Sequence, residues 1–381
     1  MRDIVIWGTG TVARSLYYKI ARNGGFRVRY FIDNAPMRSF YDYDVYLPTR
    51  ENCSKYLVVV ASSIHYEEIS VQLLEFGLEE LQDFIPYQAL GKEVVLVHGN
   101  CYKLWIQEYL QTSKTFNDRY WIYPIPRVYH IKKGFIKDHL VKNCDVLISQ
   151  DIQENDKFDE RLSFEYLSAR ATKKVICIPN VYGLGKYLFP QAKLGEGESW
   201  RNPAGPELEN GLFLYSDENI DRLWNSGERN IDTIVQYLET DIYSKQYIED
   251  NLQNCFKKWE ERDRHCDVKI MDYIKAEYKN QLLFYEPANP CNNVLRKISE
   301  RILELLDIDH NEVQEIGARN ATLELPVYRC VKEALGLKYE QEYIREVPSW
   351  EQSKLISGNM ELKEYCREYC YWCHEGKPQN L

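Results

Sequence analysis

One cysteine stands between a strand and a helix, at Gly99-Asn100-Cys101. Residues 94–97 are all apolar and predict a buried strand, whereas residues 104–110 predict an amphipathic helix. A thiol at a helix N-terminus is made more acidic by the helix dipole and is therefore a better nucleophile. The turn favours acyl transfer, with Cys101 acting as the nucleophile or as a donor at the floor of the pocket.

Two polar side chains are expected to complete this site, because each follows another buried strand. Gln150 follows residues 146–148, and Asn180 follows residues 175–178. Binding sites in open α/β sheets lie at the carboxyl ends of the strands. From that edge, Gln150 and Asn180 would donate hydrogen bonds to a developing oxyanion. The alternative is that Cys101 is a small residue packed under its helix, as free cysteines often are.

A second turn, Gly8-Thr9-Gly10, also follows a strand and opens a helix, which is the setting of a dinucleotide-binding fingerprint. Glycine allows a diphosphate to approach the helix N-terminus closely, and Asp33 ends the next strand, where a carboxylate can accept hydrogen bonds from ribose. We expect Gly8, Gly10 and Asp33 to bind a nucleotide or a nucleotide sugar. The alternative is a turn that serves folding alone. An NAD-dependent oxidoreductase is a further interpretation, supported only by this turn.

The cysteines near the C-terminus form a C-x3-C-x2-C-H pattern, which invites a metal interpretation. The pattern is compatible with a zinc ion, an iron–sulfur cluster or a haem, and also with cysteines that only pack in the core. A helix over residues 361–373 would place these side chains on one apolar stripe: Tyr365, Cys366, Tyr369 and Cys373. We therefore expect no metal here.

The elements that must position these residues predict an α/β protein. Strands and helices alternate over the first ninety residues and predict a Rossmann-like parallel-sheet domain over residues 1–91. The alternation restarts at about residue 92, so a second α/β domain is expected over residues 92–381. From about residue 217 the apolar residues recur at helical spacing, which predicts a helical C-terminal region.

Composition limits the classes of function. The 381 residues include 48 Lys and Arg against 58 Asp and Glu, a net charge of −10, which argues against a nucleic-acid partner. No apolar stretch approaches the ~20 residues of a membrane span, so we expect a cytoplasmic protein. The 11 cysteines are scattered through apolar runs and are expected to be reduced. The oligomeric state is left open.

The stretch from residue 94 to about 340 resembles the WcbI-like family of capsular polysaccharide biosynthesis enzymes. Short motifs in a shared order carry the resemblance: Val97-His98-Gly99-Asn100-Cys101, Ile148-Ser149-Gln150, Ile178-Pro179-Asn180, Leu283-Phe284-Tyr285-Glu286-Pro287 and Leu325-Pro326-Val327-Tyr328. The family implies an acetyltransferase that binds coenzyme A, so Gly99 and Asn100 are expected to contact that cofactor. The implied acceptor is a sugar or a nucleotide-linked sugar.

The N-terminal stretch resembles the small domains attached to sugar-modifying enzymes, including the nucleotide-sugar-binding domain of sialic-acid-type acetyltransferases. The shared pieces are Ile4-Val5-Ile6-Trp7-Gly8-Thr9-Gly10, Phe31-Ile32-Asp33-Asn34 and Gly77-Leu78 before Phe84-Ile85. The resemblance implies that this domain holds a nucleotide or the nucleotide end of the acceptor.

One residue departs from the expected pattern of the WcbI-like family. Where a His-Pro pair is expected, this chain has Glu286-Pro287. If that histidine is a general base, Glu286 or His98 must replace it. The rival hypothesis follows from this departure: a non-catalytic protein of the same pathway that binds a nucleotide sugar or serves as a scaffold.

Overall fold

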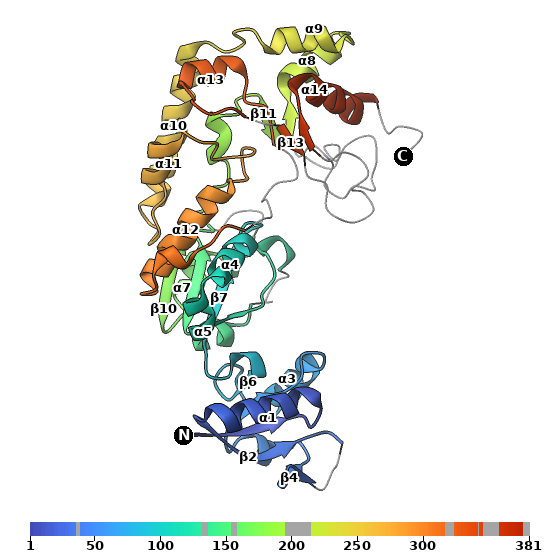
Figure 1. Ribbon diagram of the computed structural model, residues 1–381, viewed down its shortest axis with the longest axis vertical. Coiled ribbons are helices and arrows are strands. Elements are labelled where there is room, and N and C mark those ends of the chain that lie inside the picture. Colours follow the sequence, from blue (N-terminus) through green and yellow to red (C-terminus); the bar gives the residue numbers. More distant parts are fainter. Residues whose placement is uncertain are drawn as a thin grey trace. The chain divides into compact units, whose positions relative to one another are not determined.

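The structure is a computed structural model that describes residues 1–35, 39–131, 136–153, 158–194, 215–316, 324–341, 343–345 and 358–375. The chain divides into two compact units (Figure 1). The first comprises Met1–Lys103 and Gln111–Cys177, and the second comprises Leu104–Leu110 and Ile178–Leu381.

The first unit opens with a sheet whose five main strands are parallel. In spatial order they are β4 (Tyr43–Tyr46), β2 (Phe26–Ile32), β1 (Arg2–Trp7), β5 (Leu57–Val60) and β6 (Phe84–Pro86), with β3 (Ser39–Phe40) antiparallel on β4. The order of the parallel strands along the chain is 3-2-1-4-5, the Rossmann order. The last four residues of β1 and all of β5, at the centre of the sheet, are apolar and buried, because helices cover both faces there.

Alternate residues of β1 divide the apolar core of this sheet between its two faces. Ile4 and Ile6 pack with the apolar stripe of α1 (Thr11–Asn23), whereas Val5 and Trp7 pack with that of α3 (Tyr66–Glu75). The short α2 (Arg50–Cys53) contributes Cys53 to the second cluster. This doubly wound arrangement places the loops after the strands at one edge of the sheet.

A second, four-stranded sheet follows in the chain, in the order β10-β9-β7-β8. Its strands are β7 (Glu93–His98), β8 (Tyr120–Tyr123), β9 (Val146–Gln150) and β10 (Lys174–Ile178), and its helices are α4 (Lys103–Thr112), α5 (Lys114–Arg119), α6 (Asp138–Asn143) and α7 (Phe164–Ser168). β7 is parallel to both of its neighbours, and every residue of β9 is buried. The carboxyl ends of β7 and β9 therefore lie side by side.

The second unit is mostly helical. Its helices are α8 (Glu218–Asn225), α9 (Ile231–Leu238), α10 (Lys245–Asp263), α11 (Met271–Glu277), α12 (Asn292–Leu305), α13 (Arg329–Leu335) and α14 (Leu362–Cys370). Two antiparallel pairs accompany them: β11 (Ala192–Leu194) with β12 (Tyr215–Asp217), and β13 (Tyr343–Arg345) with β14 (Gly358–Met360).

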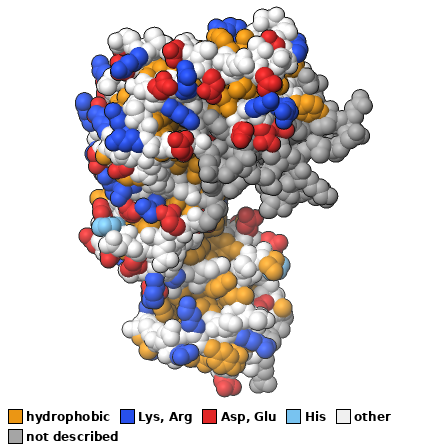
Figure 2. All heavy atoms as spheres, turned by 45° about the horizontal axis from the view of Figure 1, so that its top comes forward, with side chains coloured by type: hydrophobic (Ala, Val, Ile, Leu, Met, Phe, Trp, Pro, Cys, Tyr) orange, Lys and Arg blue, Asp and Glu red, His pale blue; other side chains and the backbone are white. Residues whose placement is uncertain are grey.

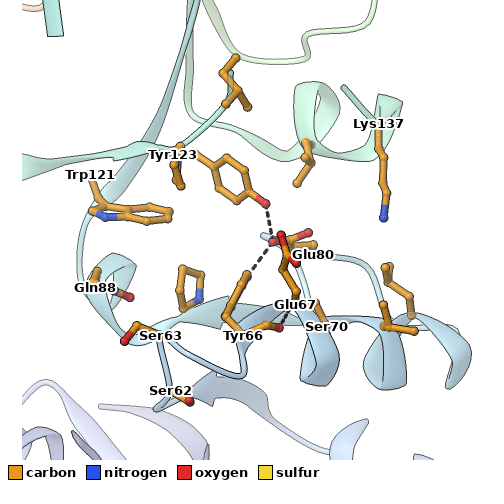
Figure 3. A pocket seen from close by; sticks show the side chains of 16 residues that line it. Ser62, Ser63, Tyr66, Glu67, Ser70, Glu80, Gln88, Trp121, Tyr123 and Lys137 are labelled. Carbon is orange, nitrogen blue, oxygen red and sulfur yellow. Dashed lines mark hydrogen bonds between the residues drawn. The ribbon is translucent and has the colours of Figure 1, made fainter. Parts of the chain in front are cut away.

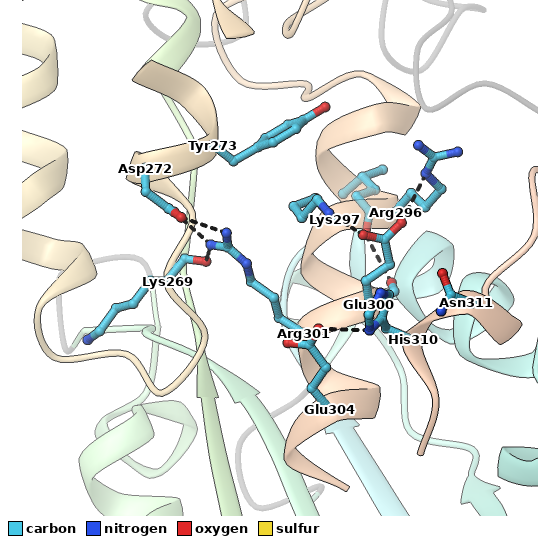
Figure 4. Close-up of polar contacts among 12 residues, drawn as sticks. Lys269, Asp272, Tyr273, Arg296, Lys297, Glu300, Arg301, Glu304, His310 and Asn311 are labelled. Atoms are coloured by element: carbon cyan, nitrogen blue, oxygen red, sulfur yellow. Dashed lines mark hydrogen bonds and ion pairs between the residues drawn. The ribbon is translucent and has the colours of Figure 1, made fainter. Parts of the chain in front are cut away.

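Helix α12 separates an apolar face from a charged one. Its apolar face, which includes Val294 and Ile298, is buried. On the charged face, Arg301 donates to both carboxylate oxygens of Asp272 on α11 at 2.7 Å, and His310 lies 3.0 Å from Glu304 (Figure 4). A bidentate arginine–carboxylate pair fixes orientation as well as charge, so α11 and α12 are held in register.

These elements confirm the predicted fold class: a Rossmann-like parallel sheet, a further α/β sheet and a helical C-terminal part. The boundary between residues 91 and 92 remains a prediction, although β6 and β7 belong to different sheets. On the face seen in Figure 2, Lys and Arg side chains are interspersed with Asp and Glu side chains. Within the described ranges, none of the helices combines the length and the apolar character needed to span a bilayer.

Candidate functional site

The turn after β7 holds Cys101 at the carboxyl edge of the second sheet. Cys101 is partly exposed, whereas Asn100 and Tyr102 on either side of it are buried. The Asn100 carbonyl accepts a hydrogen bond from the Lys103 amide at 3.2 Å, and its side-chain Oδ1 faces the Tyr102 amide at 3.3 Å. The asparagine therefore closes the turn that presents the thiol.

The Gln150 side chain reaches from β9 to this turn. The register pairs His98 with Ser149, so Gln150 comes next to the turn that follows β7. Its Oε1 accepts a hydrogen bond from the Asn100 amide at 2.7 Å. A Cβ atom on Gly99 would lie 2.6 Å from the same Oε1, so only glycine fits there.

The other end of the Gln150 amide has a different environment. Gln150 is fully buried, and its Nε2 has no hydrogen-bond partner among the residues that the structure describes. A buried donor without a partner costs roughly 1–3 kcal/mol, which a ligand acceptor would recover. This donor lies on the side chain that also fixes the Asn100 amide.

Lys103 is a component of the site that sequence reasoning missed. Its side chain is fully buried, and its Nζ donates to the carbonyls of Val97 at 3.1 Å, Ile125 at 2.5 Å and Pro126 at 3.0 Å. Burial, with a smaller contribution from Arg127, lowers the pKa of Lys103 to about 8. The signal in the sequence was a lysine two residues after Cys101 at the start of an apolar helix. It joins the end of β7 to the segment after β8.

His98 is the last residue of β7 and is also fully buried. Its Nε2 donates to the Leu162 carbonyl at 2.9 Å, which leaves Nδ1 as an acceptor with no partner in the described part of the chain. Burial lowers the pKa of His98 to about 4. The imidazole is therefore neutral at pH 7 and is a weak base.

Asn180 and Glu286 belong to the second unit. Asn180 follows β10, and its Oδ1 accepts from the Tyr182 amide at 3.3 Å; its convergence with Cys101 stays a prediction. Glu286 is buried, and Asn289 Nδ2 donates to its Oε1 at 2.6 Å. Burial raises the pKa of Glu286 to about 8, so the carboxyl group is mostly protonated at pH 7.

The turn after β1 brings Gly8, Gly10 and Asp33 together. Gly8 has φ +119, which favours glycine, and Gly10 is the N-cap of α1 with no atom within 4 Å of a Cβ built on it. The Asp33 carboxylate accepts from Thr9 Oγ1 at 2.7 Å and from the Ala35 amide at 3.0 Å. The first turn of α1 carries no acidic residue. This geometry is compatible with both a ligand site and a folding turn, so nucleotide binding stays a prediction.

The C-terminal cysteines differ in part from the sequence prediction. α14 ends at Cys370, and a π-helical turn over Tyr371–Glu375 follows. The wider turn changes the register, so Cys370 is buried beside Cys366 whereas Cys373 is partly exposed. His374 stacks on Trp224 with 5.2 Å between ring centroids, and its Nε2 lies 3.0 Å from Asp221. Over the described ranges, no three His, Cys, Asp or Glu side chains form a metal-binding group.

Two comparisons with known proteins find similarity between this chain and WcbI. The family model for the polysaccharide biosynthesis enzyme WcbI matches residues 94–311. A solved structure of WcbI is similar in fold, with a TM-score of 0.59 and 16% identity over 75% of this chain and 91% of that chain. It is described as a novel polysaccharide biosynthesis enzyme, in its native form without a disulfide bond between coenzyme A and a cysteine. No curated protein matches. The match over residues 94–311 confirms the resemblance drawn from the motifs, and the chain belongs to the WcbI family of polysaccharide biosynthesis enzymes.

Proposed function

We propose that this enzyme transfers an acyl group, in the first instance acetyl, from coenzyme A to a hydroxyl group of a sugar. The reaction would take place at the turn after β7, with Cys101, Gln150 and Asn180 as its catalytic residues. Gly99 and Asn100 would line the site for coenzyme A. The sugar, free or nucleotide-linked, belongs to the biosynthesis of a capsular or other surface polysaccharide.

One observation carries this proposal: an accessible thiol lies in the turn that Gln150 hydrogen-bonds, and the Gln150 Nε2 is a buried donor without a partner in the described part of the chain. Among the described cysteines within residues 94–311, Cys101 alone is partly exposed. A cysteine must be accessible to meet coenzyme A. Gln150 Nε2, held on the neighbouring strand by the bond from the Asn100 amide, would donate to the thioester carbonyl as negative charge develops on its oxygen.

Cys101 could take part in acyl transfer in either of two ways. As a nucleophile, its thiolate attacks the thioester carbonyl carbon, forms a new C–S bond and breaks the C–S bond to coenzyme A, which leaves as the thiol after taking a proton. The acceptor hydroxyl then attacks the acyl-cysteine, and the hydroxyl proton returns to Cys101. As a donor, Cys101 instead supports a single direct transfer, in which the hydroxyl proton ends on the sulfur of coenzyme A.

The Rossmann-like sheet would hold a nucleotide or the nucleotide end of the acceptor. The space over Gly10 and the absence of an acidic residue in the first turn of α1 both favour an anion at this helix N-terminus. Asp33 accepts one hydrogen bond on each carboxylate oxygen, from Thr9 and from Ala35, and each oxygen keeps a second lone pair that could accept from a ribose hydroxyl.

A second candidate function is a non-catalytic protein of the same pathway that binds nucleotide sugars or serves as a scaffold. It is favoured by the pKa values of the two groups expected to replace a general base. His98 has a pKa of about 4, and Glu286 has a pKa of about 8. Neither is suited to accept a proton from a hydroxyl at pH 7.

The experiment that separates the two candidates measures acetyl-CoA consumption with a panel of free and nucleotide-linked sugars. The enzyme hypothesis predicts thiol release that depends on the acceptor and falls in Cys101→Ala. Binding of coenzyme A or of a nucleotide sugar without turnover on any acceptor would favour the non-catalytic candidate.

A further inference from the structure

A cavity of about 730 Å³ lies within the first unit (Figure 3). One wall comes from the loop after β5 and from α3, with Ser62, Ser63 and Tyr66; the other comes from β8 and the segment after it, with Trp121 and Tyr123. The volume is in the range that holds a small organic ligand. The cavity is lined by residues from both sheets of the unit.

A buried carboxylate forms the polar centre of this cavity. Glu80 is only 4% exposed, and its Oε1 accepts hydrogen bonds from Tyr66 Oη at 2.6 Å and from Tyr123 Oη at 2.8 Å. Burial raises the pKa of Glu80, but His139 and the two tyrosine donors outweigh it and hold the pKa below its ordinary value, so Glu80 is ionised at pH 7. His139 Nε2 lies 3.9 Å from Oε2. An ionised carboxylate has about four acceptor positions, so Glu80 can also accept from a ligand hydroxyl or amide N–H.

The aromatic side chains give the cavity a flat apolar surface beside this acceptor. Trp121 is partly exposed and meets Tyr123 edge to face, with ring centroids 5.6 Å apart. Figure 3 shows the indole on the same side of the cavity as Tyr123, with Glu80 beyond the tyrosine hydroxyl. An indole offers a large rigid apolar face to a ring that stacks on it.

The charges argue against a phosphate inside the cavity. Glu67 and Glu80 line it together with a single cation, Lys137. Two carboxylates and one ammonium group favour neutral or donor-rich ligands over a diphosphate. A ring with one apolar face and several hydroxyl or amide donors fits both the indole and the carboxylate.

We propose that this cavity is a binding site for the glycosyl group of a sugar ligand, with Trp121 as the stacking platform and Glu80 as the acceptor for its hydroxyl or acetamide N–H groups. The site deepens the proposed function, because a sugar bound here is the candidate acceptor. Two sources share this chemistry: a free sugar or glycan end, and the sugar of a nucleotide-linked acceptor.

Each of the two turns contacts a residue that lines the cavity or precedes a lining residue in the chain. Ala61, whose carbonyl would lie 3.4 Å from a Cβ on Gly8, directly precedes Ser62 and Ser63. On the other side, Ile125 lines the cavity while its carbonyl accepts from Lys103 Nζ at the start of α4.

Saturation-transfer NMR tests the proposal on the full chain. The probes are N-acetylglucosamine, glucose and galactose, each free and linked to uridine diphosphate, with uridine diphosphate alone as the nucleotide control. In the parent protein we expect saturation at the sugar ring protons of at least one probe. Trp121→Ala should reduce it at least fivefold, and Ser63→Phe, which fills the cavity from an exposed position, should do the same.

Two further variants serve as controls. Tyr18→Ala removes an aromatic ring that is 61% exposed on α1, and Cys101→Ala removes the proposed reacting thiol; both should keep the ring-proton signal. Signal from free sugars identifies a free or glycan-end ligand, and signal from the linked probes alone identifies a nucleotide-linked ligand; each supports the site. Thermal melting checks that each variant is folded, and if Trp121→Ala unfolds, Ser63→Phe decides.

Three results would overturn the proposal: no ring-proton signal from any probe, a signal unchanged in both cavity variants, or loss in Trp121→Ala of the uracil signal alone. Failure of the acyl-transfer function is a separate result. It would appear as absent turnover on every acceptor while these NMR signals persist.

Discussion

The turn after β1 and the turn after β7 share one backbone plan: an interior parallel strand, a glycine-containing turn and a helix. They differ in what fills the turn. After β1, the space over Gly10 is open, and Thr9 donates a side-chain hydrogen bond to Asp33, which follows β2. After β7, the Gln150 side chain occupies the space that a Cβ on Gly99 would need.

Because of this difference, a ligand could approach the backbone amides of the first turn closely, whereas the second turn presents side chains. In the first turn the chemistry available is that of amide N–H groups at a helix end, which suits an anion. In the second, a thiol, a buried amide and a buried lysine are gathered on two neighbouring strands and the helix that follows. Similar topology therefore offers backbone donors in one turn and potentially reactive side chains in the other.

The largest expected effect comes from Lys103→Met. This substitution removes the buried cation of the turn after β7. Three backbone carbonyls, of Val97, Ile125 and Pro126, would lose their donor in a buried setting. We expect a loss of about 3 kcal/mol or more in the free energy of unfolding. Urea denaturation measures it, with the exposed Lys19→Met on α1 as the control. A loss no larger than that of the control would mean that Lys103 is not needed to close the turn.

Cys101→Ala tests the chemistry assigned to the second turn. The fold should be kept, because alanine is small, while acyl transfer should fall by ~10² or more. Cys101→Ser sharpens the result: turnover nearly disappears if the sulfur attacks the thioester, and persists if the group only donates a hydrogen bond. Iodoacetamide should label Cys101 before the buried cysteines, and coenzyme A should slow that labelling.

The matched control for the thiol is Cys373→Ala, because Cys373 is the other partly exposed cysteine and lies outside the family match. Its activity should equal that of the parent. Full activity in Cys101→Ala with coenzyme A still bound would show that acyl transfer does not need Cys101. The cysteine would then be a residue that only packs under its helix.

A pair of glycine substitutions contrasts the two turns directly. Gly99→Ala forces a Cβ against Gln150 and should cost about 1–3 kcal/mol as well as activity. Gly10→Asn enters open space at an N-cap that asparagine favours, so stability should change little. If a nucleotide binds there, its protection against thermal unfolding should be lost in Gly10→Asn. Equal destabilisation by both substitutions would remove the distinction between the turns.

The smallest expected effect concerns the hydrogen bond from Thr9 to Asp33 at the turn after β1. Thr9→Val removes the hydroxyl that donates to Asp33 Oδ2 and should cost about 1 kcal/mol, because the bond is only partly buried. Thermal melting measures it, and Thr11→Val, at the first residue of α1, is the control. A loss of several kcal/mol would show that the Asp33 contact is a main support of the sheet edge.

Local pattern was enough to predict much of this protein. Continuous apolar runs identify β5, β7, β9 and β10, because strands covered on both faces need no polar alternation. Glycine between a strand and a helix located both turns, since few other residues allow a tight turn there. The pairing of Gln150 with the Cys101 turn followed from the rule that carboxyl ends of parallel strands share an edge.

Tertiary structure decided what depends on burial and on contacts between distant segments. Whether Lys103 is a surface charge or a buried donor, and whether His98 and Glu286 are protonated at pH 7, is set by desolvation that no local pattern encodes. The cavity around Glu80 and Trp121 needs two sheets to meet, so neither segment alone signals it. The sequence determined which elements form, because periodicity is local; the packing of those elements determined which side chains lose water, and hence which of them can do chemistry.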